Sequence, residues 1–222
     1  MYQLYIANKN YSSWSMRPWL VLKAFDLAFE EVMLAFPAER NTGTFKQSVL
    51  AINPNGKVPV LVDHNLTIWD SLAICEYLAE RHPELALWPK DLTQRVRARC
   101  IAAEMHSGFT HLRNTCGMNI RAHLPEVGRR LWQENEELRQ DMARIEQIWA
   151  QRPDPTGFLC GDFSIADAFY APVAMRLLTY ALPLSESAQQ YIDRLLHHPA
   201  VKAWCEQARA EQAWVNYLEP YQ

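Results

Sequence analysis

The sequence contains no Cys-x-x-Cys pair and no excess of basic residues, and these absences exclude several classes of protein. Its five cysteines are scattered and odd in number, which is typical of reduced thiols rather than of a disulfide framework. No spacing of cysteine and histidine resembles a zinc site, so we expect no metal. The formal net charge of −3 argues against nucleic acid as a partner, because phosphate-binding surfaces usually belong to basic domains.

Long apolar runs are missing as well. No stretch approaches eighteen apolar residues, and the N-terminus shows no basic region followed by an apolar one. We therefore expect a cytoplasmic protein without a membrane partner. Glycine is scarce, at 7 of 222 residues, whereas tryptophan occurs 8 times, and this balance indicates a helix-rich chain with much aromatic packing.

Hydrophobic periodicity divides the chain into two parts. The first 81 residues show a βαβ-α-ββα order, and such a βαβ unit predicts parallel strands joined by a right-handed crossover. Residues 82–90 contain two prolines and read as a linker, and the rest is helical. The predicted strands cover 2–7, 30–36, 58–62 and 66–68, and the predicted helices cover 18–29, 44–52, 71–81, 93–114, 125–149, 164–178, 186–196 and 199–212.

One of these helices has a clear start signal. Ser164 and Asp167 have the spacing of a capping box, in which each side chain binds a backbone amide of the other. We expect this box to start a central helix of the bundle.

The most informative motif joins Val58-Pro59 to Asp70-Ser71. Proline inside a strand is confined to edges and special turns, and a bond before proline can be cis, which would free the backbone of Val58 for a peptide-like ligand. Ser71 stands at a helix start, where amides and the helix dipole favour a carboxylate. Each piece also has a plain structural interpretation as a turn or a cap, but together they predict a site for a zwitterionic peptide.

These segments together resemble the cytosolic glutathione transferase superfamily. The resemblance rests on Val58-Pro59, on Asp70-Ser71, on the proline-bearing linker and on Ser164-Ile165-Ala166-Asp167, and it covers essentially the whole chain. The run Asn10-Tyr11-Ser12-Ser13-Trp14-Ser15-Met16-Arg17 is most similar to serine-type bacterial and zeta-like members. It departs from the zeta pattern in having no cysteine in the loop and in having Trp19 where that pattern has a second arginine. The resemblance implies a thioredoxin-like glutathione-binding domain over 1–81, an all-helical domain over 91–222 and a homodimer.

The resemblance also implies a hydroxyl that donates a hydrogen bond to the thiolate of glutathione. Ser12, Ser13 and Ser15 are the candidates, and aligning the loop on Arg17 places Ser12 at the sulfur. Ser13 and Ser15 stay open as alternatives, and all three can simply cap the first helix.

The remaining glutathione contacts follow from the same resemblance. The backbone of Val58, beside Pro59, should pair with the cysteinyl unit in the manner of an added β-strand. Ser71 and Asp70 should bind the carboxylate and the ammonium of the γ-glutamyl unit, and Lys57 is placed to reach the glycyl carboxylate.

A second substrate, a small electrophile, should lie against the helix predicted at 93–114. Met105, His106, Phe109 and Arg113 fall on one stripe of that helix, with an apolar wall and a cation for an anionic substrate. The same spacing is also typical of bundle core.

Three functions remain open from the sequence. The first is a glutathione transferase that activates the thiolate for attack on a small electrophile. The second is a glutathione-dependent cis–trans isomerase of the maleylacetoacetate type, in which Arg17 or Arg113 would hold carboxylates. The third is a non-catalytic binding module on the same fold.

Overall fold

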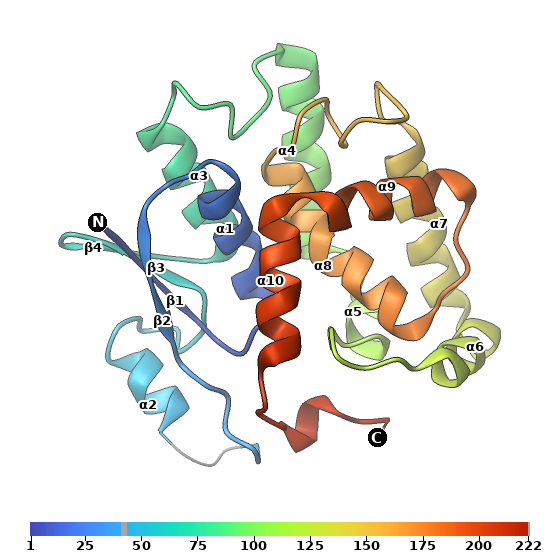
Figure 1. Ribbon diagram of the computed structural model, residues 1–222, viewed down its shortest axis with the longest axis horizontal. Coiled ribbons are helices and arrows are strands. Elements are labelled where there is room, and N and C mark those ends of the chain that lie inside the picture. The colour runs from blue at the N-terminus through green and yellow to red at the C-terminus, as the bar shows by residue number, and fades with distance from the viewer. Residues whose placement is uncertain (41–43, 222) are drawn as a thin grey trace.

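The computed structural model describes residues 1–40 and 44–221, and it shows an α/β part beside a helical part (Figure 1). The four-stranded sheet has the order β2-β1-β3-β4. Strand β1 pairs in parallel with β2, whereas β3 pairs antiparallel with both β1 and β4. The strands are β1 (Tyr2–Ile6), β2 (Phe29–Met33), β3 (Val60–Asp63) and β4 (Leu66–Trp69).

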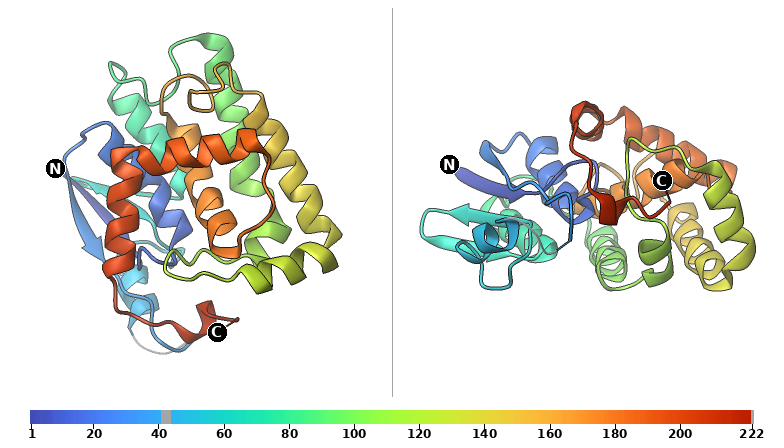
Figure 2. Two further views of the ribbon diagram at one scale, coloured as in Figure 1. Left: turned by 45° about the vertical axis from the view of Figure 1, so that its right-hand side comes forward. Right: turned by 90° about the horizontal axis from the view of Figure 1, so that it is seen from below.

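The helices fall into two groups, those of the α/β part and those of the helical part, and the second group forms a bundle beside the sheet (Figure 2). The first group comprises α1 (Ser13–Ala24), α2 (Phe45–Leu50) and α3 (Ser71–Arg81). The second comprises α4 (Leu92–Ser107), α5 (Thr110–Thr115), α6 (Pro125–Glu134), α7 (Glu136–Ala150), α8 (Ile165–Tyr180), α9 (Glu186–His197) and α10 (Pro199–Ala210), followed by the short 3-10 helix η1 (Asn216–Leu218). The predicted fold class, a thioredoxin-like domain with an all-helical bundle, is therefore confirmed.

The first helix begins earlier than predicted. It starts at Ser13 rather than at Pro18, and Pro18 lies inside it. Small polar residues favour helix starts, so the serine run itself begins the helix, and the proline merely gives up one amide hydrogen bond. The three candidate serines therefore lie at the N-terminal end of a helix.

Two long predicted helices are interrupted. The helix expected at 93–114 ends at Ser107, because the backbone of Phe109 is left-handed at φ 53° and a new helix starts at Thr110. Glycine is required just before the break, since a Cβ on Gly108 would lie 2.7 Å from the carbonyl oxygen of Glu104. The helix expected at 125–149 is divided at Asn135, whose side chain accepts a hydrogen bond from the amide of Leu138 and so caps the second piece.

Helix α1 and helix α8 form the centre of the molecule. Helix α1 contacts the sheet on one side and both α8 and α10 on the other. Helix α8 is buried almost throughout, and the ring of Trp19 on α1 meets that of Trp204 on α10 edge-on at 5.2 Å between centroids. The two parts of the chain therefore share one continuous core.

Over residues 1–40 and 44–221, we find no helix with both the length and the apolar character needed to cross a bilayer.

Candidate active site

A cleft of about 470 Å³ opens at the N-terminal end of α1. It brings together segments that are far apart in sequence: the β1–α1 loop, the turn before β3, the start of α3, and residues around α2 and η1. The lining residues are Tyr11, Ser12, Ser13, Trp14, Phe36, Phe45, Asn55, Gly56, Lys57, Val58, Pro59, Asp70, Ser71 and Leu218. The residues predicted to bind glutathione therefore lie around one cavity.

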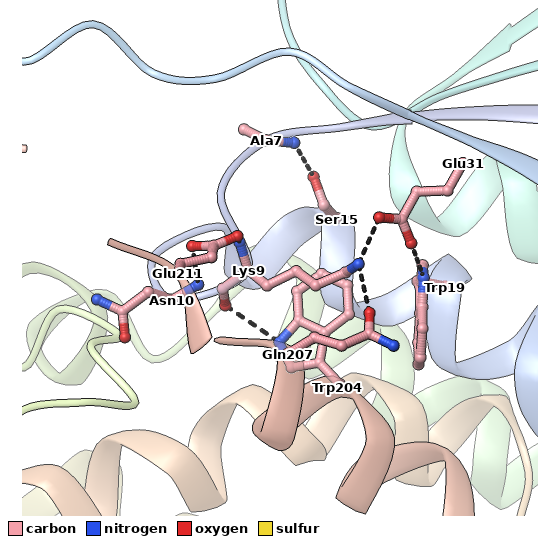
Figure 3. A network of polar contacts seen from close by, with 9 residues as sticks. All are labelled: Ala7, Lys9, Asn10, Ser15, Trp19, Glu31, Trp204, Gln207 and Glu211. Carbon is pink, nitrogen blue, oxygen red and sulfur yellow. Dashed lines mark hydrogen bonds and ion pairs between the residues drawn. The ribbon is translucent and has the colours of Figure 1, made fainter. Parts of the chain in front are cut away.

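The three candidate serines are placed differently. Ser12 and Ser13 line the cleft, whereas Ser15 is fully buried and accepts a hydrogen bond from the amide of Ala7 at 3.3 Å (Figure 3). The Oγ of Ser12 donates to the Oγ of Ser15 at 2.7 Å. Either hydroxyl of this pair can supply the proton, since Ala7 occupies only one acceptor position of Ser15. The Oγ of Ser13 instead accepts from Arg176 at 3.0 Å, so its own O–H remains available as a donor.

The N-terminal end of α1 can attract an anion. Ser12, at the N-cap of α1, forms no side-chain hydrogen bond with the first-turn amides. The first amides of a helix have no partner within the helix and carry the positive end of its dipole. The N-terminus of α1 therefore favours a negative group in the cleft.

A buried asparagine shapes the turn that carries Lys57 and Val58. The side-chain nitrogen of Asn53 donates to the Oδ1 of Asn55 at 2.6 Å and to the carbonyl oxygen of Lys57 at 3.1 Å. The amide of Lys57 in turn donates to Asn55 at 2.9 Å. The bond between Val58 and Pro59 is cis, and β3 begins only at Val60, so Val58 lies at the cleft rather than in the ladder.

Asp70 and Ser71 form the start of α3. The carboxylate of Asp70 accepts hydrogen bonds from the amides of Leu72 and Ala73 at 2.8 and 3.4 Å, which makes Asp70 the N-cap. Its backbone is held at φ 73°, a conformation that non-glycine residues rarely adopt and that clusters at functional sites. Ser71 also lines the cleft, although it is fully buried from solvent.

A buried arginine and a histidine support this pair from behind. Arg17 donates to the Oγ of Ser71 at 3.3 Å and lies 3.4 Å from the Nδ1 of His106, whose Nε2 lies 3.2 Å from the carboxylate of Asp70. Because Nδ1 faces the arginine donor, we assign the proton to Nε2. Burial lowers the pKa of His106, so the imidazole is neutral near pH 7 and its Nε2–H donates to Asp70.

Three arginines gather around the first turn of α1, which holds Ser13 and Trp14. The ring of Trp14 lies over the guanidinium carbons of Arg17 and Arg113 at 4.2 and 5.1 Å, a cation–π geometry. Burial lowers the pKa of Arg17 to about 9 and that of Arg176 to about 10, and the nearby charge of Arg113 adds to both shifts. All three remain cationic at neutral pH, so positive potential accumulates beside the start of α1.

The four residues predicted for the second substrate do not share one helical stripe, because the chain breaks at Phe109. Met105 is buried in the core, Phe109 is buried at the break, and Arg113 donates to the carbonyl oxygens of His106 and Gly108. Among the described residues that line the cleft, none of the four occurs.

The apolar wall of the cleft comes from residues that sequence reasoning missed. Phe36 and Phe45 contact each other at 5.1 Å between ring centroids, and Leu218 faces the same cavity from η1. No local pattern marks these residues, since they belong to the β2–α2 connection, to α2 and to the C-terminal segment.

Within residues 1–40 and 44–221, no group of three or more histidine, cysteine, aspartate or glutamate side chains is arranged to hold a metal ion.

Comparison with known proteins gives the family. The models "Glutathione S-transferase, N-terminal domain" and "Glutathione S-transferase, C-terminal domain" match residues 11–81 and 118–207. A maleylacetoacetate isomerase from Pseudomonas aeruginosa is 30% identical over 214 residues, 90% of this chain and 93% of the relative. Glutathione S-transferase 1 from Dianthus caryophyllus is 32% identical over 179 residues, 80% of this chain and 77% of the relative.

A solved structure agrees. The crystal structure of a glutathione transferase homolog from Burkholderia with bound glutathione has a TM-score of 0.70 at 25% identity, and covers 95% of this chain and 99% of that one. The chain belongs to the glutathione S-transferase family. The predictions of this family and of a glutathione S-transferase enzyme are confirmed.

Proposed function

We propose that the protein binds glutathione in the cleft at the start of α1 and holds its sulfur as a thiolate for attack on a small electrophile. The observation that carries this proposal is the position of Ser12 at the N-terminus of α1, inside a cavity that Val58, Asp70 and Ser71 also line. The relative from Burkholderia was solved with bound glutathione, which supports glutathione as the ligand of this cavity.

The thiolate forms when the sulfur releases its proton to solvent. The hydroxyl of Ser12 then donates to the sulfur anion, while Ser15 reverses its hydrogen bond and donates to Ser12 from behind. The helix end and the cationic group of Arg17, Arg113 and Arg176 add positive potential, and such charge favours the ionised thiol. Of the alternatives, Ser13 also lines the cleft, and Ser15 acts through Ser12.

The rest of the tripeptide fits the remaining wall. Val58 offers its backbone to the cysteinyl unit beside Pro59. Ser71 binds the γ-glutamyl carboxylate with its hydroxyl, which Arg17 polarises, and Asp70 binds the ammonium. Lys57, which is exposed at the rim, attracts the glycyl carboxylate.

The test is the acidity of bound glutathione. The ultraviolet absorbance of the thiolate, followed against pH with saturating protein, should give a thiol pKa at least about one unit below the ordinary ~8.5 of a free thiol. Calorimetry should show binding at one site. A protein that fails to bind glutathione would favour a non-catalytic module, and an unshifted thiol pKa would contradict activation.

Replacing Lys57 with alanine is expected to raise the KM for glutathione about fivefold and to leave kcat unchanged, because an exposed ion pair is worth only about 1 kcal/mol. Steady-state kinetics at low and high salt measure this effect, which should shrink as salt screens the charge. Lys90→Ala, at an exposed lysine of the linker, is the matched control. A fall in kcat would place Lys57 in the chemistry instead.

A second candidate reaction is the glutathione-dependent cis–trans isomerisation of a dicarboxylic acid. It is favoured by the similarity to the maleylacetoacetate isomerase of Pseudomonas aeruginosa and by the group of three arginines. Reversible addition of the thiolate permits rotation about the former double bond. Assays with a cis enone diacid and with an aryl halide decide between the two reactions, and turnover of the halide alone would reject the isomerase.

We further propose that the protein is a cytoplasmic homodimer. Leu66 and Trp69 are exposed on the edge strand β4, and Leu92 and Val96 are exposed on α4. Exposed apolar groups on an edge strand and on a helix of the other part suit packing of one subunit's sheet against its partner's bundle. Analytical ultracentrifugation tests the dimer, which should sediment with twice the 25.7 kDa mass of one chain.

A further inference from the structure

The loop that carries Ser12 is held by residues from the C-terminal end of the chain. The carboxylate of Glu211 accepts hydrogen bonds from the backbone amides of Lys9 and Asn10, at 2.7 and 3.2 Å (Figure 3). The indole nitrogen of Trp204 donates to the carbonyl oxygen of Lys9 at 3.1 Å. Helix α10 and the residue after it thus fix the first half of the loop.

A second carboxylate holds the other half. Glu219, which is 6% exposed, accepts from the hydroxyl of Tyr11 at 2.5 Å and from the side chain of Asn119 at 2.6 Å. Asn119 accepts in turn from the side chain of Asn10 at 2.8 Å, and Arg121 donates to the hydroxyl of Tyr11 at 3.0 Å. Asn10 and Tyr11 are therefore tied to one buried glutamate by a closed polar network.

Such a network fixes geometry more strongly than its single bonds suggest. Buried polar groups that satisfy one another rigidify their surroundings, and a half-satisfied network is costly. Tyr11 lines the cleft and is bonded directly to Ser12 in the chain, so a displacement of Tyr11 displaces the hydroxyl that follows it. Burial and the carboxylate of Glu219 raise the pKa of Tyr11, which keeps this phenol neutral and able to donate to Glu219.

We propose that Glu219, assisted by Glu211, is a positioning residue that sets the hydroxyl of Ser12 against the sulfur of glutathione. The inference rests on the proposed function, since it concerns the same thiolate. In the proposed function, glutathione is bound by the opposite wall of the cleft, at Val58 and Ser71. Loss of the contacts from Glu219 and Glu211 to the loop should therefore affect the stability of the thiolate more than the affinity for glutathione. The C-terminal segment is thereby part of the catalytic apparatus although it supplies no group to the sulfur.

The test is the direction in which Glu219→Gln moves the thiol pKa of bound glutathione. Removing a negative charge near the thiolate would, through charge alone, lower that pKa. Loss of positioning predicts the reverse, a rise of about half a unit, with kcat lower by about tenfold and KM for glutathione within about twofold of wild type. The same absorbance titration and steady-state kinetics measure all three.

Tyr11→Phe removes the same contact from the loop side and should act in the same direction, so it carries the test if the glutamine variant does not fold. Glu206→Gln, an exposed residue on α10 paired with Lys202, makes the same change of charge away from the loop and should change nothing. This inference would be overturned, and the proposed function left intact, by the following result. The wild type lowers the thiol pKa of bound glutathione, and in Glu219→Gln and Tyr11→Phe that pKa equals the wild-type value or lies below it. An unshifted thiol pKa in the wild type would instead contradict the proposed function.

Discussion

Replacing Ser12 with alanine is expected to lower kcat about a hundredfold, the size of effect seen when one preorganised donor to a developing anion is removed. The thiol pKa of bound glutathione should rise toward ~8.5, because the sulfur anion loses its hydroxyl donor and keeps only the helix amides and the cationic group. Affinity for glutathione should change little, since the contacts with Val58 and Ser71 stay in place. Kinetics with a saturating electrophile and the absorbance titration give both quantities.

Ser13→Ala is the matched control for this variant. Ser13 lines the same cleft, but it accepts its hydrogen bond from Arg176 and not from the loop serines. A larger loss of kcat in Ser13→Ala than in Ser12→Ala would indicate that Ser13, and not Ser12, donates the hydrogen bond to the thiolate. Unchanged turnover in both variants would contradict a hydroxyl donor at either position and leave the helix amides and Ser15 as donors.

Replacing Asp167 with alanine is expected to lower the free energy of unfolding by about 3 kcal/mol, because buried donors are left without an acceptor. Its carboxylate is fully buried and accepts from the amides of Leu159 and Ser164 at 2.9 and 3.0 Å and from the hydroxyl of Tyr191 at 3.0 Å. The residue thus joins the start of α8 to the preceding loop and to α9. Denaturant unfolding measures the loss, and Asp162→Ala, at a nearby exposed aspartate, is the control.

The same carboxylate predicts a pH dependence. Burial raises the pKa of Asp167 from 3.8 to about 6, so the folded state holds this proton more tightly than the unfolded state. The bound proton therefore stabilises the folded state. This stabilisation is complete at pH values below the pKa of Asp167 in the unfolded chain, and it is lost as the pH rises through the pKa of Asp167 in the folded protein. The difference in unfolding free energy between wild type and Asp167→Asn should therefore shrink by about 1 kcal/mol between pH 5 and 7. A difference that grows over this range would contradict the assignment.

Local patterns predicted what depends on local structure. The capping box at Ser164 and the helix from Ser71 to Arg81 follow from residue types at fixed spacing, and the structure contains both. The bond before Pro59 is cis, in accord with its place just before a strand. The turn, the serine loop and the acid–serine pair meet at one cavity because a βαβ-α-ββα order brings these segments to one end of the sheet.

The support of the site could not be predicted in this way. Arg17 reaches Ser71 and His106 across 54 and 89 positions of the chain, and Glu219 reaches Tyr11 across 208. Such contacts depend on how whole helices pack, and no spacing in the sequence encodes them. The break at Phe109 was missed for a related reason, since the apolar periodicity continues across it while one left-handed residue redirects the chain.

The placement of α1 between the sheet and α8 restricts how new members of such a family can be assembled. The contact between Trp19 and Trp204 and the hydrogen bond from Arg176 to Ser13 join α1 to the bundle. The position of α1 therefore depends on the second half of the chain as much as on the first. In a chimaera that combined the first half of this chain with the helical bundle of a distant homologue, α1 would pack against side chains that do not fit it. Recombination at the linker should succeed only between parents whose α8 and α10 carry matching side chains on the surface that contacts α1.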